Sequence, residues 1–233
     1  MNFEELYREL EANGSEQTRK TYRRHGAPEP MFGVSFAVLG KLKKSVVSPG
    51  KKKGVNQEIA QQLWDTKNTD ARTLALMVID PDVLTETEAE DWLKEINYQA
   101  LADYFAQAVA KTSFAEKKLH KWIKSKDEYV RRTGYSLLNS LIKGGKKFDE
   151  HDFDQYMEKI EKELQSSANW AKEAMNTSLV AIGSVNETLR ARVIEIADRI
   201  GPVEVDYGDT HCQTIVVKEY LERIYARKKT MKF

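Results

Sequence analysis

The sequence predicts an all-α fold in which helices pair and stack in series. Apolar residues recur with a helical period of about 3.6 along almost the whole chain, and no segment shows the sustained polar–apolar alternation of a strand. Only 5 Pro and 12 Gly occur among 233 residues, which leaves little room for a turn-rich β architecture. With 41% hydrophobic residues, a chain of this length can bury a core large enough to fold unaided.

Start and stop signals delimit these helices. Ser35 and Asn56 can cap helix N-termini, and Thr85 with Glu88 forms a capping box, in which each side chain satisfies the other's backbone donor. Ser48-Pro49-Gly50 and Asp80-Pro81 are typical of helix ends. In chain order the helices are predicted over residues 2–12, 16–25, 35–47, 56–66, 69–80, 85–95, 98–111, 114–125, 127–143, 150–165, 168–182, 187–200 and 214–230.

Short helices with short connections indicate hairpins that each bury one face on the next, as in HEAT-like or ARM-like helical-repeat solenoids. We therefore predict one repeat domain over residues 1–233, a curved α-superhelix with a concave basic surface. The C-terminal loop and helix occupy 200–233, and Val203–Val205 is predicted to be loop. A globular helical bundle fits the helix pattern as well, since the repeats are too dissimilar to define a period.

Charge is segregated along the chain although the net charge is only +1. Residues 17–54 hold ten Lys/Arg and one acid. Residues 55–102 hold three Lys/Arg and ten acids, and residues 111–147 hold eleven Lys/Arg and three acids. Basic segments that share one face would bind a polyanion; otherwise they are ordinary solvated helix faces. The loop Lys51–Lys53 could contact phosphate or only add solubility. The candidates for DNA-phosphate contacts are Arg23, Arg24, Lys41, Lys43, Lys44, Arg131 and Lys143.

Several classes of protein are excluded. The single cysteine, Cys212, rules out a disulfide framework and a multi-cysteine zinc site, and His211 with two nearby acids supplies too few ligands for a metal. Glycine-rich phosphate loops, HExxH and GxSxG are absent, so no metal and no cofactor is predicted. No apolar run approaches the roughly 20 residues that span a bilayer, and the acidic N-terminus does not resemble a secretory signal. A cytoplasmic protein is expected.

Two predicted helices carry lines of polar residues. Gln99, Asp103 and Gln107 follow one another at i, i+4 and i+8. A second line runs along 127–143 and consists of Tyr129, Arg132, Ser136, Asn139 and Lys143. If both lines face one cleft, a carboxylate and a guanidinium meet there, which suits chemistry on a cationic sugar beside a phosphate. A lone acid on a helix surface also fits plain surface decoration.

Seven short stretches occur in a fixed order: 22–26, 32–35, 63–66, 70–75, 80–81, 129–134 and 174–183. Together they resemble the AlkD-like DNA alkylation-repair family of HEAT-like glycosylases, over about residues 20–185. The resemblance implies a monomeric protein that binds damaged or branched double-stranded DNA and is associated with the nucleoid when bound. It also implies hydrolysis of the N-glycosidic bond of cationic N3- or N7-alkylated purines.

The resemblance assigns roles to individual residues. Asp103 matches the catalytic aspartate, which stabilises an oxocarbenium-like sugar, and Arg132 matches the arginine that holds the phosphate. Gln99 and Thr177 stand where the family has two tryptophans. The residues Tyr98 and Trp170, which lie nearby in sequence, are candidate replacements, and with Gln107 they complete the predicted substrate groove.

Three functions stay open at this point. The retained Asp103 and Arg132 favour a DNA glycosylase. The missing aromatics favour a non-catalytic binder of damaged or branched DNA on the same scaffold. A helical-repeat scaffold for protein partners is the third, and the basic segments argue against it.

Overall fold

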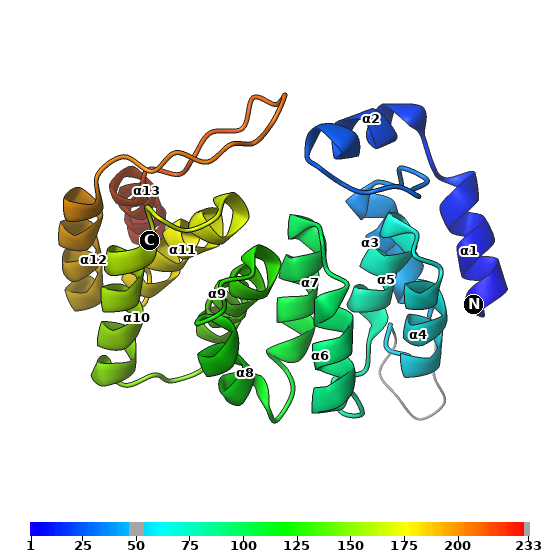
Figure 1. The fold of residues 1–233 in the computed structure, drawn as a ribbon, viewed down its shortest axis with the longest axis horizontal. Coiled ribbons are helices and arrows are strands. Elements are labelled where there is room, and N and C mark those ends of the chain that lie inside the picture. Colours follow the sequence, from blue (N-terminus) through cyan, green and yellow to red (C-terminus); the bar gives the residue numbers. More distant parts are fainter. Residues whose placement is uncertain (47–53, 231–233) are drawn as a thin grey trace. The chain divides into compact units, whose positions relative to one another are not determined.

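The computed structural model describes residues 1–46 and 54–230, which form helices and no strand (Figure 1). The helices are α1 Phe3–Ala12, α2 Glu16–Arg24, α3 Phe36–Ser45, α4 Gln57–Asp65, α5 Thr69–Val78, α6 Glu86–Lys94, α7 Gln99–Val109, α8 Ala115–Trp122, α9 Glu128–Lys143, α10 Glu150–Glu163, α11 Asn169–Gly183, α12 Glu187–Ile200 and α13 Val217–Thr230. The all-α prediction is confirmed, with every predicted helix present. The helix stop at 48–50 and the loop Lys51–Lys53 lie outside the described residues.

The capping signals act as predicted. The side chains of Ser35 and Asn56 accept the backbone N–H of Val38 and Ile59, and Thr85 forms a complete capping box with Glu88. Residues 203–205 are loop. Side-chain hydrogen bonds within three residues of each cap therefore stabilise these helix starts.

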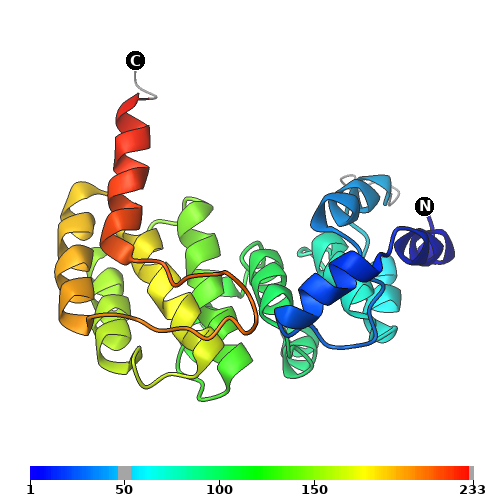
Figure 2. The same cartoon turned by 90° about the horizontal axis from the view of Figure 1, so that it is seen from above.

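The chain divides into two compact units, each with its own core. Unit 1 comprises Met1–Ala115 with Tyr207–His211, and unit 2 comprises Glu116–Asp206 with the described residues from Cys212 on. In unit 1, α5 packs against α1, α3, α4 and α7. In unit 2, α11 packs against α9, α12 and α13, and Figure 2 shows α13 beside α11. The single-domain prediction stays a prediction.

Three of the four tryptophans lie in these cores. Trp64 and Trp92 in unit 1 stack with ring centroids 4.6 Å apart, and Trp122 in unit 2 is fully buried. The guanidinium of Arg72 lies 4.4 Å from the Trp64 ring centroid, so a buried cation covers the stacked pair. These rings stabilise the fold and are not available to a substrate.

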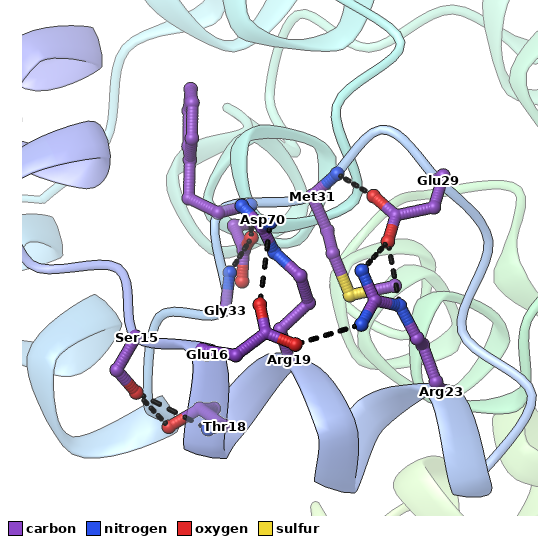
Figure 3. Close-up of polar contacts among 10 residues, drawn as sticks. Ser15, Glu16, Thr18, Arg19, Arg23, Glu29, Met31, Gly33 and Asp70 are labelled. Atoms are coloured by element: carbon purple, nitrogen blue, oxygen red, sulfur yellow. Dashed lines mark hydrogen bonds and ion pairs between the residues drawn. The ribbon is translucent and has the colours of Figure 1, made fainter.

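A buried carboxylate holds the loop between α2 and α3. Asp70, near the start of α5, accepts the backbone N–H groups of residues 32, 33 and 34 at 2.6, 2.9 and 2.9 Å, and Figure 3 shows Asp70 beside Gly33. The neighbouring Thr69 hydroxyl donates to the carbonyl oxygen of Pro28 at 2.6 Å. Because this loop follows α2 directly, the start of α5 fixes where the basic α2 lies on unit 1.

Gly134 allows α9 to approach the end of α8 closely. A Cβ atom at this position would lie 2.6 Å from the backbone nitrogen of Ile123 and 2.8 Å from the carbonyl carbon of Trp122. Both atoms belong to the backbone, so a clash cannot be relieved by a side-chain rotation.

We expect Gly134→Ala to lower the free energy of unfolding of unit 2 by about 2–3 kcal/mol, since overpacking forces the two helices apart. Gly40→Ala is the matched control, because Gly40 lies within α3 and a Cβ there meets nothing within 4 Å. The control is expected to gain about 0.5–1 kcal/mol from helix propensity. Chemical denaturation followed by circular dichroism measures both, and equal effects would contradict the close-approach argument.

No helix among the described residues is long and apolar enough to cross a bilayer.

Candidate functional site

The predicted polar line on α7 is present in unit 1. The other face of this helix is buried against α5 and α6 through residues such as Leu101 and Phe105. This packing leaves Gln99 and Asp103 half-buried and Gln107 exposed. Tyr98, the residue before the helix, is only 5% exposed and belongs to the core.

Gln99 connects α7 to the end of α2. Its side-chain amide donates to the backbone carbonyl oxygen of His25 at 2.9 Å, and His25 is the C-cap of α2. A carbonyl at a helix C-terminus has no partner within its own helix, so this hydrogen bond satisfies one such group. Gln99 therefore has a role in positioning the basic α2.

Aromatic side chains gather beside Asp103. The ring centroids of Tyr22 and Phe36 lie 5.6 Å apart, and those of Phe36 and Tyr104 lie 5.8 Å apart. Phe36 is 41% exposed. Burial raises the pKa of the Tyr104 hydroxyl, and the negative charge of Asp103 raises it further. Asp103 thus has aromatic neighbours, although none occupies the expected tryptophan position.

Sequence reasoning missed this aromatic cluster because its members come from α2, α3 and α7. Phe36 gave the one local signal. A phenylalanine directly after the Ser35 cap stands at a helix start, where it has no obvious core role.

The predicted phosphate-binding residues of unit 1 differ in how free their charges are. Arg23 pairs with Glu29 at 2.7 Å and with Glu16 at 3.0 Å (Figure 3). Arg24 is 63% exposed, and it pairs with the 93% exposed Asp209 at 3.7 Å. A loosely held, exposed cation costs least to transfer to a phosphate, so Arg24 suits that role better than Arg23.

The three lysines of α3 form a second group. Lys41 and Lys44 are exposed, opposite the buried Leu39 and Leu42. Lys43 is half-buried, and its pKa is lowered by burial and by the charge of Lys111. Lys43 and Gln107 are brought together, because both line a cleft of 770 Å³.

In unit 2, the guanidinium of Arg132 is buried and ion-paired. It lies 2.5 Å from the carboxylate of Glu173, donates to the carbonyl oxygen of Trp170 at 3.0 Å, and lies 5.8 Å from the Trp170 ring centroid. The Arg132 side chain is only 6% exposed and that of Glu173 is 22% exposed. Charge-assisted hydrogen bonds of this kind are strong, so a phosphate would compete with an acid of the same chain.

The α11 side of this site follows a helical line. Trp170, Glu173 and Thr177 lie at i, i+3 and i+7, and all three are half-buried. The Thr177 hydroxyl donates to the Glu173 carbonyl oxygen at 3.0 Å. The structure therefore brings together the predicted residues Arg132 and Trp170 and adds Glu173, while Thr177 lies one turn further along α11. Glu173 was missed, although its spacing from Trp170 and Thr177 is a helical-face signal.

Arg131 has a structural environment. It lies 2.6 Å from the Glu163 carboxylate and donates to the Ser167 hydroxyl at 2.9 Å and to the Ser125 carbonyl oxygen at 2.7 Å. Burial raises the pKa of the Glu163 carboxyl, but the charges of Lys159 and Arg131 outweigh it and hold that pKa below its ordinary value. The guanidinium of Arg131 thus links α9 to α10 and the α10–α11 loop.

Lys143 is the remaining predicted phosphate contact, and it is exposed at the C-terminal end of α9. Asp103 belongs to unit 1 and Arg132 to unit 2, so the predicted meeting of carboxylate and guanidinium stays a prediction. Within the described part of the chain, no three His, Cys, Asp or Glu side chains are grouped closely enough to hold a metal ion.

Comparison with known proteins places this geometry in context. A family model described as "DNA alkylation repair enzyme" matches residues 6–211. An uncharacterised protein of Listeria innocua is 26% identical over 227 residues, covering 96% of this chain and 97% of the relative. A Listeria monocytogenes protein, also uncharacterised, is 26% identical over 234 residues, covering 98% and 100%.

A solved structure is similar over 98% of this chain and 95% of its own, with a TM-score of 0.86 and 29% sequence identity. It is described as belonging to "a new family of proteins related to the HEAT-like repeat DNA glycosylases with affinity for branched DNA structures". The predicted helical-repeat fold is thereby confirmed.

Proposed function

The chain belongs to the DNA alkylation repair enzyme family, and from that membership we propose that it is a DNA-binding repair protein that recognises branched DNA. The description of the similar solved structure, which has affinity for branched DNA, supports this choice of ligand. The exposed cations on α2 and α3 support contacts to the phosphate backbone.

The ion pair between Arg132 and Glu173 carries the choice of binding over catalysis. The side chain that matches the family's phosphate-holding arginine is already neutralised by a carboxylate of its own chain. The positions of the two family tryptophans are held by Gln99, which bonds to α2, and by Thr177. Binding of the DNA backbone by exposed residues requires neither an unpaired Arg132 nor the two tryptophans.

Base excision at Asp103 is the second candidate, and the neighbouring aromatic cluster favours it. An N3- or N7-alkylated purine is already cationic, so the base can leave without being protonated by a strong acid when the glycosidic bond breaks. A half-buried carboxylate would stabilise the developing sugar cation and place a water molecule. Exposed Phe36, with Tyr104, would supply cation–π contacts to the charged base, worth about 0.5–2 kcal/mol each.

Binding is tested by titrating a four-way DNA junction and a linear duplex of equal length over a range of salt concentrations. We expect tighter binding of the junction, and a slope of log K against log salt of about −0.9 for each phosphate neutralised. The variant Lys41→Ala/Lys44→Ala should make this slope shallower by roughly two, whereas Lys94→Ala, an exposed lysine paired with Asp91 on α6, should not. Salt-independent binding, or none, would contradict the proposal and favour a protein-binding scaffold.

Catalysis is tested in parallel by release of methylated purine from a methylated duplex, with wild type beside Asp103→Asn. We expect no release from either protein while both bind the junction. Release by wild type that collapses in Asp103→Asn would establish the second candidate. Release that survives the substitution would place the chemistry at another residue.

A further inference from the structure

Unit 2 contains a pocket of 920 Å³ between α9, α10, α11 and α13, named here the α9–α11 pocket. Its volume lies within the range of about 300–1,000 Å³ that is usual for ligand sites. Lys143, a predicted phosphate contact, and Thr177, a predicted substrate-groove residue, line it together. Neither Arg132 nor Asp103 lines this pocket, so it is separate from the sites described above.

One side of the pocket is apolar and aromatic. Phe148 contributes a ring that packs edge-on against Phe153, with centroids 5.6 Å apart at 62°. On α13 and at the end of α11, Tyr220 is 40% exposed and Val185 is 45% exposed. Large apolar side chains that stay this exposed around a hollow indicate a site for a flat apolar group.

The rim of the pocket is basic, and its backbone is fixed. After α9, the N–H of Gly145 donates to the Ile142 carbonyl oxygen and that of Lys146 to the Leu141 carbonyl oxygen, at 3.1 and 3.0 Å. Gly145 adopts φ +83°, so these bonds form a Schellman turn. The turn places Lys146 and Lys147 on the same rim as Lys143.

The lysines differ in their pairing. Lys146 is ion-paired with Glu116. No ion pair joins Lys143 or Lys147 to an acid among the residues with described positions, and both are exposed. Two such cations beside an apolar hollow fit a ligand that carries a negative charge next to a flat ring.

A hydrogen-bonding group with unused capacity lies in the wall. The side-chain oxygen of Asn139 is buried and has no hydrogen-bond partner within the described ranges. A buried amide left without a partner costs free energy, which a ligand bearing a polar edge can recover.

We propose that the α9–α11 pocket binds an unpaired nucleotide of a branched DNA, such as one at a fork. The base lies in the apolar part against Tyr220, and the adjoining phosphates contact Lys143 and Lys147. Stacking on an aromatic ring accepts any base, so this site recognises the absence of pairing and no particular sequence. The inference rests on the proposed binding of branched DNA.

The test compares a blunt duplex with the same duplex carrying a short unpaired thymidine tail. Wild type is expected to bind the tailed DNA more tightly. Tyr220→Ala should weaken binding of the tailed DNA by about tenfold, because stacking on one aromatic ring is worth that order. Binding of the blunt duplex should be unchanged, and Tyr220→Phe, which keeps the ring, should behave as wild type.

A charge substitution gives an independent readout. Val185→Asp sets a carboxylate at the pocket and should weaken binding of the tailed DNA selectively, whereas Val83→Asp on unit 1 is the matched control, since Val83 is 48% exposed and outside the pocket. 2-Aminopurine placed in the unpaired tail should lose fluorescence on binding to wild type and keep it with Tyr220→Ala. The three substituted side chains, Tyr220, Val185 and Val83, are all exposed, so folding is expected to be preserved.

The outcomes separate the two proposals. Equal binding of both DNAs by wild type, or equal losses on both DNAs in Tyr220→Ala, would overturn the pocket while leaving branched-DNA binding to be judged by the junction titration. Failure of wild type to bind the four-way junction as well as both duplexes would overturn the proposed function and the pocket with it.

Discussion

Replacing Asp70 with alanine is expected to lower the free energy of unfolding by about 4 kcal/mol. Three backbone N–H groups of the 32–34 loop would lose their acceptor at once, and two of these residues are fully buried. Each unsatisfied buried donor costs about 1–3 kcal/mol, and the bonds to a charged acceptor are the stronger kind. A domain stable by about 5–15 kcal/mol would lose a large share of its stability.

Guanidinium denaturation followed by tryptophan fluorescence measures this loss, because Trp64 and Trp92 lie in the core of the same unit. Asp70→Asn keeps one acceptor oxygen and should lose an intermediate amount. Asp91→Ala removes an acid that is 60% exposed and pairs only at the surface with Lys94, so a change below about 0.5 kcal/mol is expected. If Asp70→Ala and Asp91→Ala cost the same, the carboxylate does not hold the loop.

Much of the fold could be predicted because its determinants are local. Ser35, Asn56 and Thr85 each satisfy backbone donors a few residues away, so the helix starts are encoded where they occur. The role of Asp70 could not be predicted in this way. Its three donors lie 36–38 residues earlier in the chain, and nothing in the local sequence indicates that contact.

The candidate site was predictable to the same extent. The line of Gln99, Asp103 and Gln107 follows from helical periodicity, and the structure leaves these side chains off the buried face of α7 as expected. The ion pair of Arg132 could not be predicted from the sequence, because its partner Glu173 lies on another helix, 41 residues away. Sequence spacing identifies which residues share a face, whereas tertiary packing decides which of their charges are already neutralised.

Because Glu173 pairs with Arg132, we expect Glu173→Gln to tighten the binding of DNA. The substitution removes the carboxylate that holds Arg132, while the Trp170 carbonyl and ring keep the guanidinium in place. One additional cation that engages a phosphate should steepen the salt dependence by about 0.9 and raise affinity at low salt by about fivefold to tenfold. Junction titration over a range of salt concentrations measures both quantities.

Loss of net negative charge alone would also tighten binding, so the control must change charge equally elsewhere in unit 2. Glu161→Gln does so, because Glu161 pairs with Arg199 at the surface and its removal exposes no buried cation. A double-mutant cycle with Arg132→Ala then isolates the coupling, since the gain from Glu173→Gln should vanish when the guanidinium is absent.

Glu173→Gln should also lower the free energy of unfolding by about 1–2 kcal/mol, because it weakens a largely buried ion pair. Tighter binding together with lower stability would mean that this chain gives up phosphate contact at Arg132 in exchange for a more stable α9–α11 interface. A gain that persists in the Arg132→Ala background would instead assign the effect to long-range charge, and would leave the guanidinium a purely structural group.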